Sequence, residues 1–291
     1  MNWPKGCRVK TKYPLKEKTT FKVGGSAQFF SEPGDPAELR CLLGAAKRNK
    51  LPVFVLGAGS NLLVSDKGVK GLVIKLNSAY FKRIVLQGSC IKAGSAAALS
   101  QLIRFAQGKS LRGLEFLSGI PGTLGGALAM NAGCWEQAIG DWVKEVTVMD
   151  HSGRIKILAA KDIKFTYRDS GLGKYIILSA LLRLKKGSRM QIQKNINKYL
   201  MFRRQAQDSS RPNAGCIFKN PPQRYAGKLI DLCGLKAKRL GGALVSERHA
   251  NFILNNGRAS AKDILGLMRI IRKKVKDRFK ITLQPEIKIW A

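Results

Sequence analysis

Acidic residues are scarce in this 291-residue chain: 18 aspartates and glutamates stand against 53 lysines and arginines, giving a formal net charge of +35. There are only two histidines, and the six cysteines form no C-x-x-C pair. This pattern argues against a zinc site or a disulfide framework, so we expect no bound metal and reduced thiols. The sequence also lacks a run of 18 apolar residues and an apolar segment near its N-terminus, which predicts no membrane span and no signal peptide. We therefore expect a cytoplasmic protein.

The excess of positive charge is spread along the chain rather than concentrated. Basic residues run from Lys5 to Lys288 without a dense arm or an Arg/Gly-rich tail. Such an excess generally indicates a nucleic acid, an acidic surface or a polyanionic substrate. A solvated surface explains an even spread at least as well. Because no nucleic-acid-reading motif and no interleaving of aromatic with basic residues is present, we expect no nucleic-acid partner.

Apolar periodicity predicts a mixture of helices and strands. A helix at 37–50 precedes a short apolar strand at 51–55, and another strand follows at 70–76, so residues 37–76 are expected to form a small βαβ-like unit. Alternating strands are expected between about residues 142 and 184, with a hairpin turn at 151–153. Further helices are predicted at 97–111, 192–205, 225–234 and 260–279, and short strands at 243–246, 252–255 and 287–290. Breaks in the pattern place domain boundaries near residues 77 and 188.

Two glycine-rich stretches suggest a bound cofactor. "GAGSN", Gly57 to Asn61, follows the buried strand, where glycines let backbone amides approach an anion closely. It is not a dinucleotide fingerprint, because Leu62 occupies the third glycine position; alone, it reads equally well as a simple turn. The stretch from Gly113 to Trp135 has six glycines in 23 residues and is a poor helix or strand. It suits a backbone wrapped around a flat, phosphate-bearing cofactor, with a tightly packed buried turn as the alternative.

Seven segments give the chain a resemblance to a known family. They are "TTFKVGG", "VLGAGSNLLVSDKGVKGLVI", "GLEFLSGIPGTLGGALAMNAG", "FTYRDS", "NAGCIFKNP", "VSERHANFILN" and "LQPEIKI", in this order. Together they resemble UDP-N-acetylenolpyruvoylglucosamine reductase, in its shorter subtype, over nearly the whole chain. The resemblance implies an α+β fold: a two-part FAD-binding module of the vanillyl-alcohol-oxidase type and a C-terminal α/β substrate-binding domain. We expect these at residues 1–76, 77–187 and 188–291.

The resemblance also implies a two-step reaction with a small-molecule substrate. NADPH would reduce a non-covalently held FAD, and UDP-N-acetylglucosamine enolpyruvate would then be reduced to UDP-N-acetylmuramate, a peptidoglycan precursor. We expect a monomer. The residues implied to hold FAD are Gly57, Ala58, Gly59, Ser60, Asn61, Ser118, Gly119, Pro121, Gly122, Thr123, Gly125, Gly126 and Asn131.

Three residues are implied to carry the chemistry. Arg168 of "YRDS" would bind the substrate carboxylate in bidentate fashion, and Glu286 of "QPE" would donate a hydrogen bond to it. Cys216 occupies the position of the family's proton donor, which is often serine. Without the surrounding motif, Cys216 would read as a packed structural thiol. Residues implied to contact the substrate are Tyr167, Lys219, Asn220 and Arg204.

Two other interpretations remain to be distinguished. One is a different flavin oxidase or reductase on the same scaffold, against which the trio of Arg168, Cys216 and Glu286 argues. The other is a basic nucleic-acid-binding protein, which the missing reading motif disfavours. His249 and Asn251 of "RHANF" are expected to be structural hydrogen-bonding residues.

Overall fold

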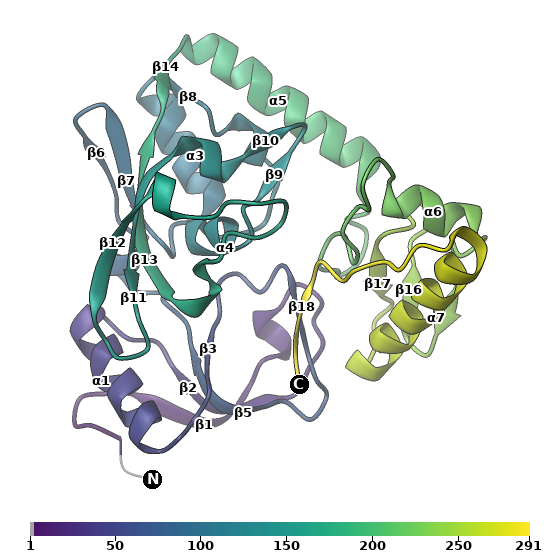
Figure 1. The fold of residues 1–291 in the computed structure, drawn as a ribbon, viewed down its shortest axis with the longest axis horizontal. Helices are drawn as coiled ribbons and strands as arrows, with labels where there is room; N and C mark the ends of the chain where they lie inside the picture. Colours follow the sequence, from purple (N-terminus) through teal and green to yellow (C-terminus); the bar gives the residue numbers. More distant parts are fainter. Residues whose placement is uncertain (1–2) are drawn as a thin grey trace. The chain divides into compact units, whose positions relative to one another are not determined.

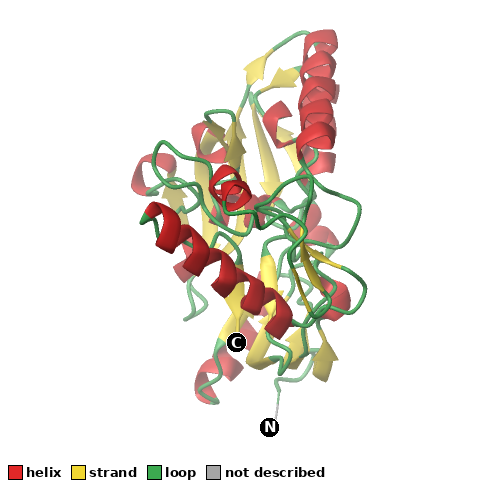
Figure 2. Ribbon diagram, turned by 90° about the vertical axis from the view of Figure 1, so that its right-hand side faces the viewer, coloured by secondary structure: helices red, strands yellow, loops and turns green. Residues whose placement is uncertain are grey.

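The computed structural model describes residues 3–291 and divides into two compact units (Figure 1). The first comprises residues 3–11, 29–58 and 70–202, and the second comprises residues 12–28, 59–69 and 203–291. Helices and strands occur in both units. Figure 2 shows the helices in red and the strands in yellow. The predicted mixture of α and β structure is therefore confirmed.

One sheet of the first unit has the strand order β1 (Val9–Pro14), β2 (Ser26–Ser31), β5 (Val69–Ile74) and β3 (Val53–Val55). Strands β3 and β5 pair in parallel. Helix α1 (Pro36–Arg48) packs its apolar stripe, which includes Leu39 and Leu42, against residues of β5. The predicted helix and both strands are thus confirmed. The expected βαβ order is wrong, because α1 precedes β3 and the segment joining β3 to β5 holds glycine turns and a strand, β4 (Leu62–Val64).

The other large sheet of the first unit is antiparallel. Its order is β12 (Ile155–Ala159), β11 (Val143–Met149), β13 (Ile176–Arg183), β7 (Cys90–Gly94) and β6 (Ile84–Gln87). Side chains of β11 that alternate inward, such as Val146 and Val148, are fully buried with Leu102 of α3 (Leu99–Gly108). The alternating pattern in the sequence therefore predicted this sheet correctly, except for β6 and β7, which it missed.

The glycine-rich stretch 113–135 is more regular than predicted. It holds a 3₁₀ turn (Glu115–Leu117), helix α4 (Leu124–Ala129) and strand β9 (Gly133–Cys134), which pairs with β10 (Gln137–Ala138). The Thr123 side chain caps α4 by accepting a hydrogen bond from Gly126 N at 3.4 Å. Leu124 and Leu128 of α4 are buried. Capping and packing therefore stabilise a helix that glycine content alone disfavours.

The remaining elements of the first unit are short, apart from one helix. Helix α5 (Arg189–Ala206) is mostly exposed, with Ile192 as its one buried residue, and its last residues belong to the second unit. The other elements are α2 (Ala79–Lys82), β8 (Leu111–Arg112), β14 (Lys185–Lys186) and 3₁₀ turns at Ile139–Trp142, Ala160–Asp162 and Leu172–Lys174.

The second unit is built around helix α7 (Ala261–Phe279). Its apolar residues Ile264, Leu267 and Ile271 are buried in a core shared with α6 (Ala226–Leu232). The Ser260 hydroxyl and the Asp263 carboxylate form a capping box at the start of α7. The strands are β15 (Arg239–Leu240), β16 (Ala243–Val245) and β17 (Ile253–Asn255), together with β4 paired in parallel with β18 (Lys288–Trp290); a 3₁₀ turn lies at Lys16–Lys18.

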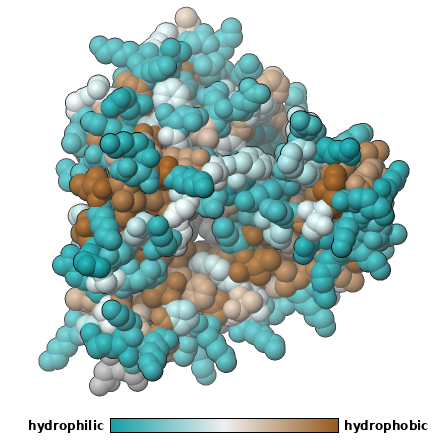
Figure 3. All heavy atoms as spheres, in the orientation of Figure 1, coloured by the Kyte–Doolittle hydropathy of each residue, from teal (hydrophilic) through white to brown (hydrophobic). Residues whose placement is uncertain are grey.

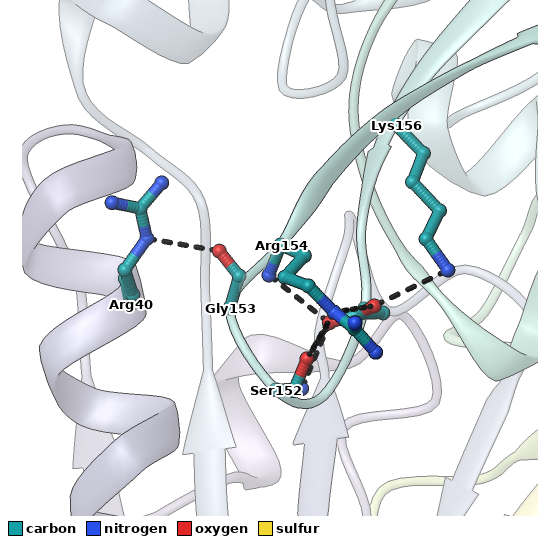
Figure 4. A network of polar contacts seen from close by, with 6 residues as sticks. Arg40, Ser152, Gly153, Arg154 and Lys156 are labelled. Carbon is teal, nitrogen blue, oxygen red and sulfur yellow. Dashed lines mark hydrogen bonds and ion pairs between the residues drawn. The ribbon is translucent and has the colours of Figure 1, made fainter.

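The predicted hairpin turn at 151–153 is confirmed and is held by a polar network (Figure 4). The Asp150 carboxylate accepts hydrogen bonds from the backbone N–H groups of Ser152 and Arg154 and forms an ion pair with Lys156 at 3.3 Å. Hydrogen bonds from Ser152 and Arg154 hold the pKa of Asp150 below its usual range. Arg40 Nε of α1 donates to Gly153 O at 2.9 Å, so the turn is tied to the helix.

Charged and polar residues cover much of the face that Figure 3 shows, with smaller hydrophobic patches between them. Among residues 3–291, no helix combines the length and apolar character needed to cross a membrane.

Replacement of Asp35 by Ala should weaken α1. The Asp35 carboxylate accepts hydrogen bonds from Ala37 N at 2.8 Å and Glu38 N at 2.9 Å, which would otherwise lack intrahelical partners. We expect Asp35→Ala to lower the free energy of unfolding by about 1 kcal/mol in urea titration, with Asp35→Asn as the control that keeps a capping oxygen. Equal stability of the alanine variant and the wild type would contradict this account of the helix start.

Candidate active site

Several of the residues predicted to hold the cofactor are glycines of the first unit, and we call the surface that they form with Ser95 the cofactor wall. A Cβ atom at Gly57 would lie 3.0 Å from the Thr123 hydroxyl, and one at Gly125 would lie 2.9 Å from the Ser95 Cβ. Ser95 is 5 % exposed, and its hydroxyl has no hydrogen-bond partner among residues 3–291. Gly126 is exposed, and a Cβ there would come no closer than 3.6 Å, to the Thr123 hydroxyl. The wall therefore combines bare backbone with a buried hydroxyl.

The other predicted cofactor residues of this unit lie along the same stretch. Ser118 is buried at the end of the 3₁₀ turn, and Gly122 O accepts a hydrogen bond from Leu99 N at 3.0 Å. Gly119 and Pro121 are exposed, as is Ala58 beside Gly57. Within residues 118–126, buried or hydrogen-bonded residues are thus interspersed with exposed ones.

The second half of the "GAGSN" loop belongs to the second unit. Gly59 has φ of +68°, and a Cβ there would lie 2.2 Å from Lys18 O, so only glycine fits. Ser60 and Asn61 are half-buried. Asn61 Nδ2 donates to Glu286 O at 3.2 Å, and Asn61 O accepts from Lys288 N at 2.9 Å. These bonds bring the predicted cofactor loop and the predicted catalytic segment around Glu286 together.

Arg168 lies in a tight turn in the first unit. Thr166 N donates to Asp169 O at 2.8 Å, and Asp169 N donates to Thr166 O at 3.3 Å, so Tyr167 and Arg168 form the tip of the turn, with Tyr167 exposed and Arg168 half-buried. The φ of Arg168 is +58°, a left-handed conformation that non-glycine residues rarely adopt. Its guanidinium lies 5.3 Å from the centre of the Tyr167 ring, and Nη1 donates to Gly133 O at 2.8 Å. Tyr167 is 53 % exposed, so its ring both supports the guanidinium and faces solvent.

The rest of the "YRDS" motif anchors this turn. Asp169 Oδ1 accepts hydrogen bonds from Ser170 N at 2.8 Å and Gly171 N at 3.2 Å. Ser170 is 1 % exposed, and its hydroxyl donates to Ala129 O, at the end of α4, at 3.1 Å. The motif therefore joins the Arg168 turn to the glycine-rich stretch that is predicted to hold the cofactor.

Cys216 lies on an extended segment of the second unit. It forms an antiparallel bridge with Phe252, while Phe218 forms one with Pro285 on another segment. Glu286 N donates to Ile217 O at 2.8 Å. Cys216 is half-buried and in no disulfide. The structure therefore places the backbone of Glu286 beside Ile217, the residue that follows Cys216. Cys216 and Glu286, two predicted catalytic residues that are far apart in the sequence, thus lie on neighbouring segments.

Asn251 and His249 support this segment, as predicted for structural residues. The side-chain amide of Asn251, which is 2 % exposed, accepts from Phe218 N at 3.0 Å and donates to Phe218 O at 2.8 Å. His249 Nδ1 accepts from Asn251 N at 3.2 Å. Burial lowers the pKa of His249, because the charged imidazolium is disfavoured there, and the Lys236 charge adds to this effect.

The predicted substrate-contacting residues of the second unit have defined backbone positions. Lys219 N donates to Gln284 O at 2.9 Å, which places Lys219 on the Cys216 segment. Asn220 Oδ1 accepts from Ala226 N at 3.0 Å, at the start of α6. Arg204 lies in the last turn of α5, and its carbonyl accepts a hydrogen bond from the Arg248 guanidinium. Among residues 3–291, no cluster of three or more His, Cys, Asp or Glu side chains could hold a metal ion.

Known proteins with related sequences identify the family. Residues 27–159 match a family model described as an FAD binding domain, and residues 205–290 match the C-terminal domain of UDP-N-acetylenolpyruvoylglucosamine reductase. The reductase of that name from Caldanaerobacter subterraneus is 44% identical over 95% of this chain and 91% of its own. This chain belongs to the UDP-N-acetylenolpyruvoylglucosamine reductase family.

Other relatives of this reductase family agree with the assignment. A second reductase, from Symbiobacterium thermophilum, is 42% identical over 98% of this chain and 92% of its own. The crystal structure of the Thermus caldophilus reductase superposes with a TM-score of 0.86 at 37% identity, covering 98% of this chain and all of that one. A cholesterol oxidase shares the fold over 63% of this chain and 39% of its own, with a TM-score of 0.50 at 17% identity. The predicted fold class and FAD-dependent oxidoreductase activity are confirmed.

The residues present fit FAD. The exposed backbone of Gly126 gives a flat cofactor room to approach, while Gly57 and Gly125 allow close packing against Thr123 and Ser95. The buried Ser95 hydroxyl offers a polar group that has no partner among residues 3–291. Sequence reasoning missed Ser95, because a serine at the end of a strand has no distinguishing pattern. The signal that identifies it is structural: its hydroxyl is buried and has no partner among residues 3–291, and its Cβ packs against Gly125.

His249 should make stability depend on pH. Its pKa is lower in the folded than in the unfolded state, where the reference value is about 6.5, so the unfolded state binds more protons. The stabilising contribution of neutral His249 is therefore complete above the unfolded pKa and is lost as the pH falls toward the folded pKa. We expect urea titrations to show a shallower loss of stability between about pH 7.5 and 5.5 in His249→Gln than in the wild type. An equally steep loss in both would show that the imidazole of His249 is not responsible.

Proposed function

We propose that this protein reduces UDP-N-acetylglucosamine enolpyruvate to UDP-N-acetylmuramate, with NADPH as the hydride donor and Cys216 as the proton donor. The observation that supports this most strongly is the joining of Glu286 to the Cys216 segment by the Glu286 N to Ile217 O hydrogen bond. The names of the relatives support the substrate and its place in peptidoglycan precursor synthesis. Bound FAD would carry the hydride from NADPH to the UDP-sugar.

Arg168 has the role of binding the substrate carboxylate. When hydride reaches the terminal carbon of the enolpyruvyl double bond, negative charge develops on the carboxylate. A guanidinium can contact both carboxylate oxygens and stabilises that charge in place. The left-handed backbone of Arg168 and the hydrogen bond to Gly133 O restrict where its guanidinium lies. Such a restricted donor loses little entropy on binding.

Cys216 and Glu286 have the remaining roles. The carbon next to the new C–H bond needs a proton, which the Cys216 thiol donates, and Glu286 in its acid form donates a hydrogen bond to the carboxylate oxygens. A thiol is a stronger acid than the serine hydroxyl common at this position, with a reference pKa of about 8.5. Lys219 and Asn220 lie further along the Cys216 segment, and with Tyr167 and Arg204 they are proposed to contact the UDP-sugar.

The remaining assignments are also proposals. Residues 57–61 and 118–126 are proposed to contact FAD. The three-part division at residues 76 and 187, the monomeric state and a cytoplasmic location stay predictions.

Loss of the carboxylate-binding groups should damage one half-reaction selectively. We expect Arg168→Lys, which loses the two-pronged contact, and Glu286→Ala, which loses the carboxyl donor, to slow reoxidation of the reduced flavin by the UDP-sugar roughly 100-fold, or about 3 kcal/mol, because charge develops where the contact is lost. Stopped-flow reduction by NADPH should stay within several-fold of wild type. Arg183→Lys, at an exposed strand end, is the matched control. Equal losses in both half-reactions would mean that these residues position the flavin or the nicotinamide instead.

Cys216 should be replaceable by serine but not by alanine. Cys216→Ala should still be reduced by NADPH but lose roughly 100- to 10,000-fold in turnover, the usual contribution of a positioned proton donor. Cys216→Ser should stay active and keep its rate to higher pH, since a serine hydroxyl does not ionise where a thiol does.

Alkylation provides an independent check on Cys216. Iodoacetamide should inactivate the wild type, and the UDP-sugar should protect it, while Cys216→Ser should resist. Cys41→Ser, which removes an exposed cysteine of the first unit, should remain sensitive. Wild-type turnover in Cys216→Ala would show that Cys216 is a packed thiol and that another group delivers the proton.

A further inference from the structure

The turn that bears Arg168 adopts a conformation that its own sequence disfavours. Arg168 has a φ of +58°, where glycine is usual, and the turn closes through hydrogen bonds between Thr166 and Asp169. Such a conformation persists only where the surrounding structure holds it. The contacts around Thr166 and Gly133 show what holds it.

The side-chain amide of Asn131 forms a hydrogen bond with the start of this turn. Its Nδ2 donates to Thr166 O at 2.9 Å, and its Oδ1 accepts from Gly140 N at 3.1 Å. Asn131 is 8 % exposed, so both bonds are shielded from water. A Cβ at Gly140 would lie 2.9 Å from Asn131 Oδ1 and 2.6 Å from the Phe165 ring, so glycine is required for the amide to lie there. One amide therefore links the 3₁₀ turn at 139–142 to the turn of Arg168.

The segment that follows Asn131 binds the guanidinium of Arg168. Gly133 O, two residues beyond Asn131, accepts the hydrogen bond from Arg168 Nη1 at 2.8 Å. Gly133 begins the β9–β10 hairpin, whose tip residue Trp135 packs against Tyr199 of α5 with ring centres 5.0 Å apart. Gln137 Nε2 of the same hairpin donates to Tyr199 Oη at 3.1 Å. Residues 131–137 thus hold both the Thr166 carbonyl at the start of the turn and the guanidinium of Arg168.

We propose that Asn131 is a positioning residue for Arg168, which acts by pinning the Thr166 carbonyl and thereby the left-handed turn. This inference rests on the proposed role of Arg168 in binding the substrate carboxylate. It gives the Asn131 amide a function within the protein, because its Nδ2 donates to Thr166 O and its Oδ1 accepts from Gly140 N. Asn131 then governs the half-reaction with the UDP-sugar rather than the one with NADPH.

Two substitutions separate the parts of this role. Asn131 has a φ of +42°, so Asn131→Gly removes the amide without backbone strain, and Asn131→Asp keeps the acceptor for Gly140 N but loses the donor to Thr166 O. We expect both variants to retain FAD and to be reduced by NADPH at near wild-type rate. Reoxidation by the UDP-sugar should slow about 10- to 100-fold, the scale of a misplaced catalytic group. Asn77→Ala, which removes an exposed amide of the first unit, should change neither step.

A double-mutant cycle with Arg168→Lys tests whether Asn131 acts through Arg168. If it does, adding Asn131→Gly to Arg168→Lys should slow reoxidation less than threefold further, far less than in the wild-type background. Full additivity, or loss of FAD and of both half-reactions together in Asn131→Gly, would overturn the inference in favour of a direct cofactor contact. If Arg168→Lys alone left reoxidation unchanged, the proposed role of Arg168 would fail instead, so the two failures are distinguishable.

Discussion

Hydrogen bonds from asparagine side chains to irregular backbone underlie the arrangement of the candidate site. Asn61 binds the carbonyl of Glu286, Asn131 binds the carbonyl of Thr166, and Asn251 pairs with both backbone groups of Phe218. Loops that leave regular sheets have N–H and C=O groups that need other partners when buried. A side-chain amide can donate and accept at once. Each proposed catalytic group therefore lies at, or within two residues of, a backbone position fixed in this way.

Arg168 is one of the residues at which this arrangement strains the backbone, with a φ of +58°. A left-handed non-glycine residue costs of order 1–3 kcal/mol, and such strain persists only where surrounding contacts exceed it. Buried anchors of the same stretch supply those contacts: the Ser170 hydroxyl on Ala129 O and the Asn131 amide on Thr166 O. The glycine-rich stretch thus serves two purposes. It leaves backbone bare for a flat cofactor and provides the carbonyls that hold the carboxylate-binding turn.

Periodicity in the sequence predicted the regular elements because burial itself is periodic. The stripe of α1, the alternation in β11 and the apolar residues of α7 were all recognised for this reason. Helix α4 was missed because its small residues carry little amphipathic signal and its stability comes from the Thr123 cap and from packing. Ordered motifs indicated Arg168, Cys216 and Glu286, but not their supports. The Asn61 to Glu286 hydrogen bond joins residues 225 apart, which no local pattern can predict.

The central claim is that one FAD-binding chain accepts a hydride from NADPH and passes it to a UDP-linked enolpyruvyl ether. Its most direct test is a titration of the wild-type holoenzyme without oxygen, followed in the visible flavin band. NADPH should bleach the band, and UDP-N-acetylglucosamine enolpyruvate should restore it stoichiometrically while UDP-N-acetylmuramate is formed. A bleached enzyme that the UDP-sugar leaves unchanged, and that only oxygen reoxidises, would contradict the account.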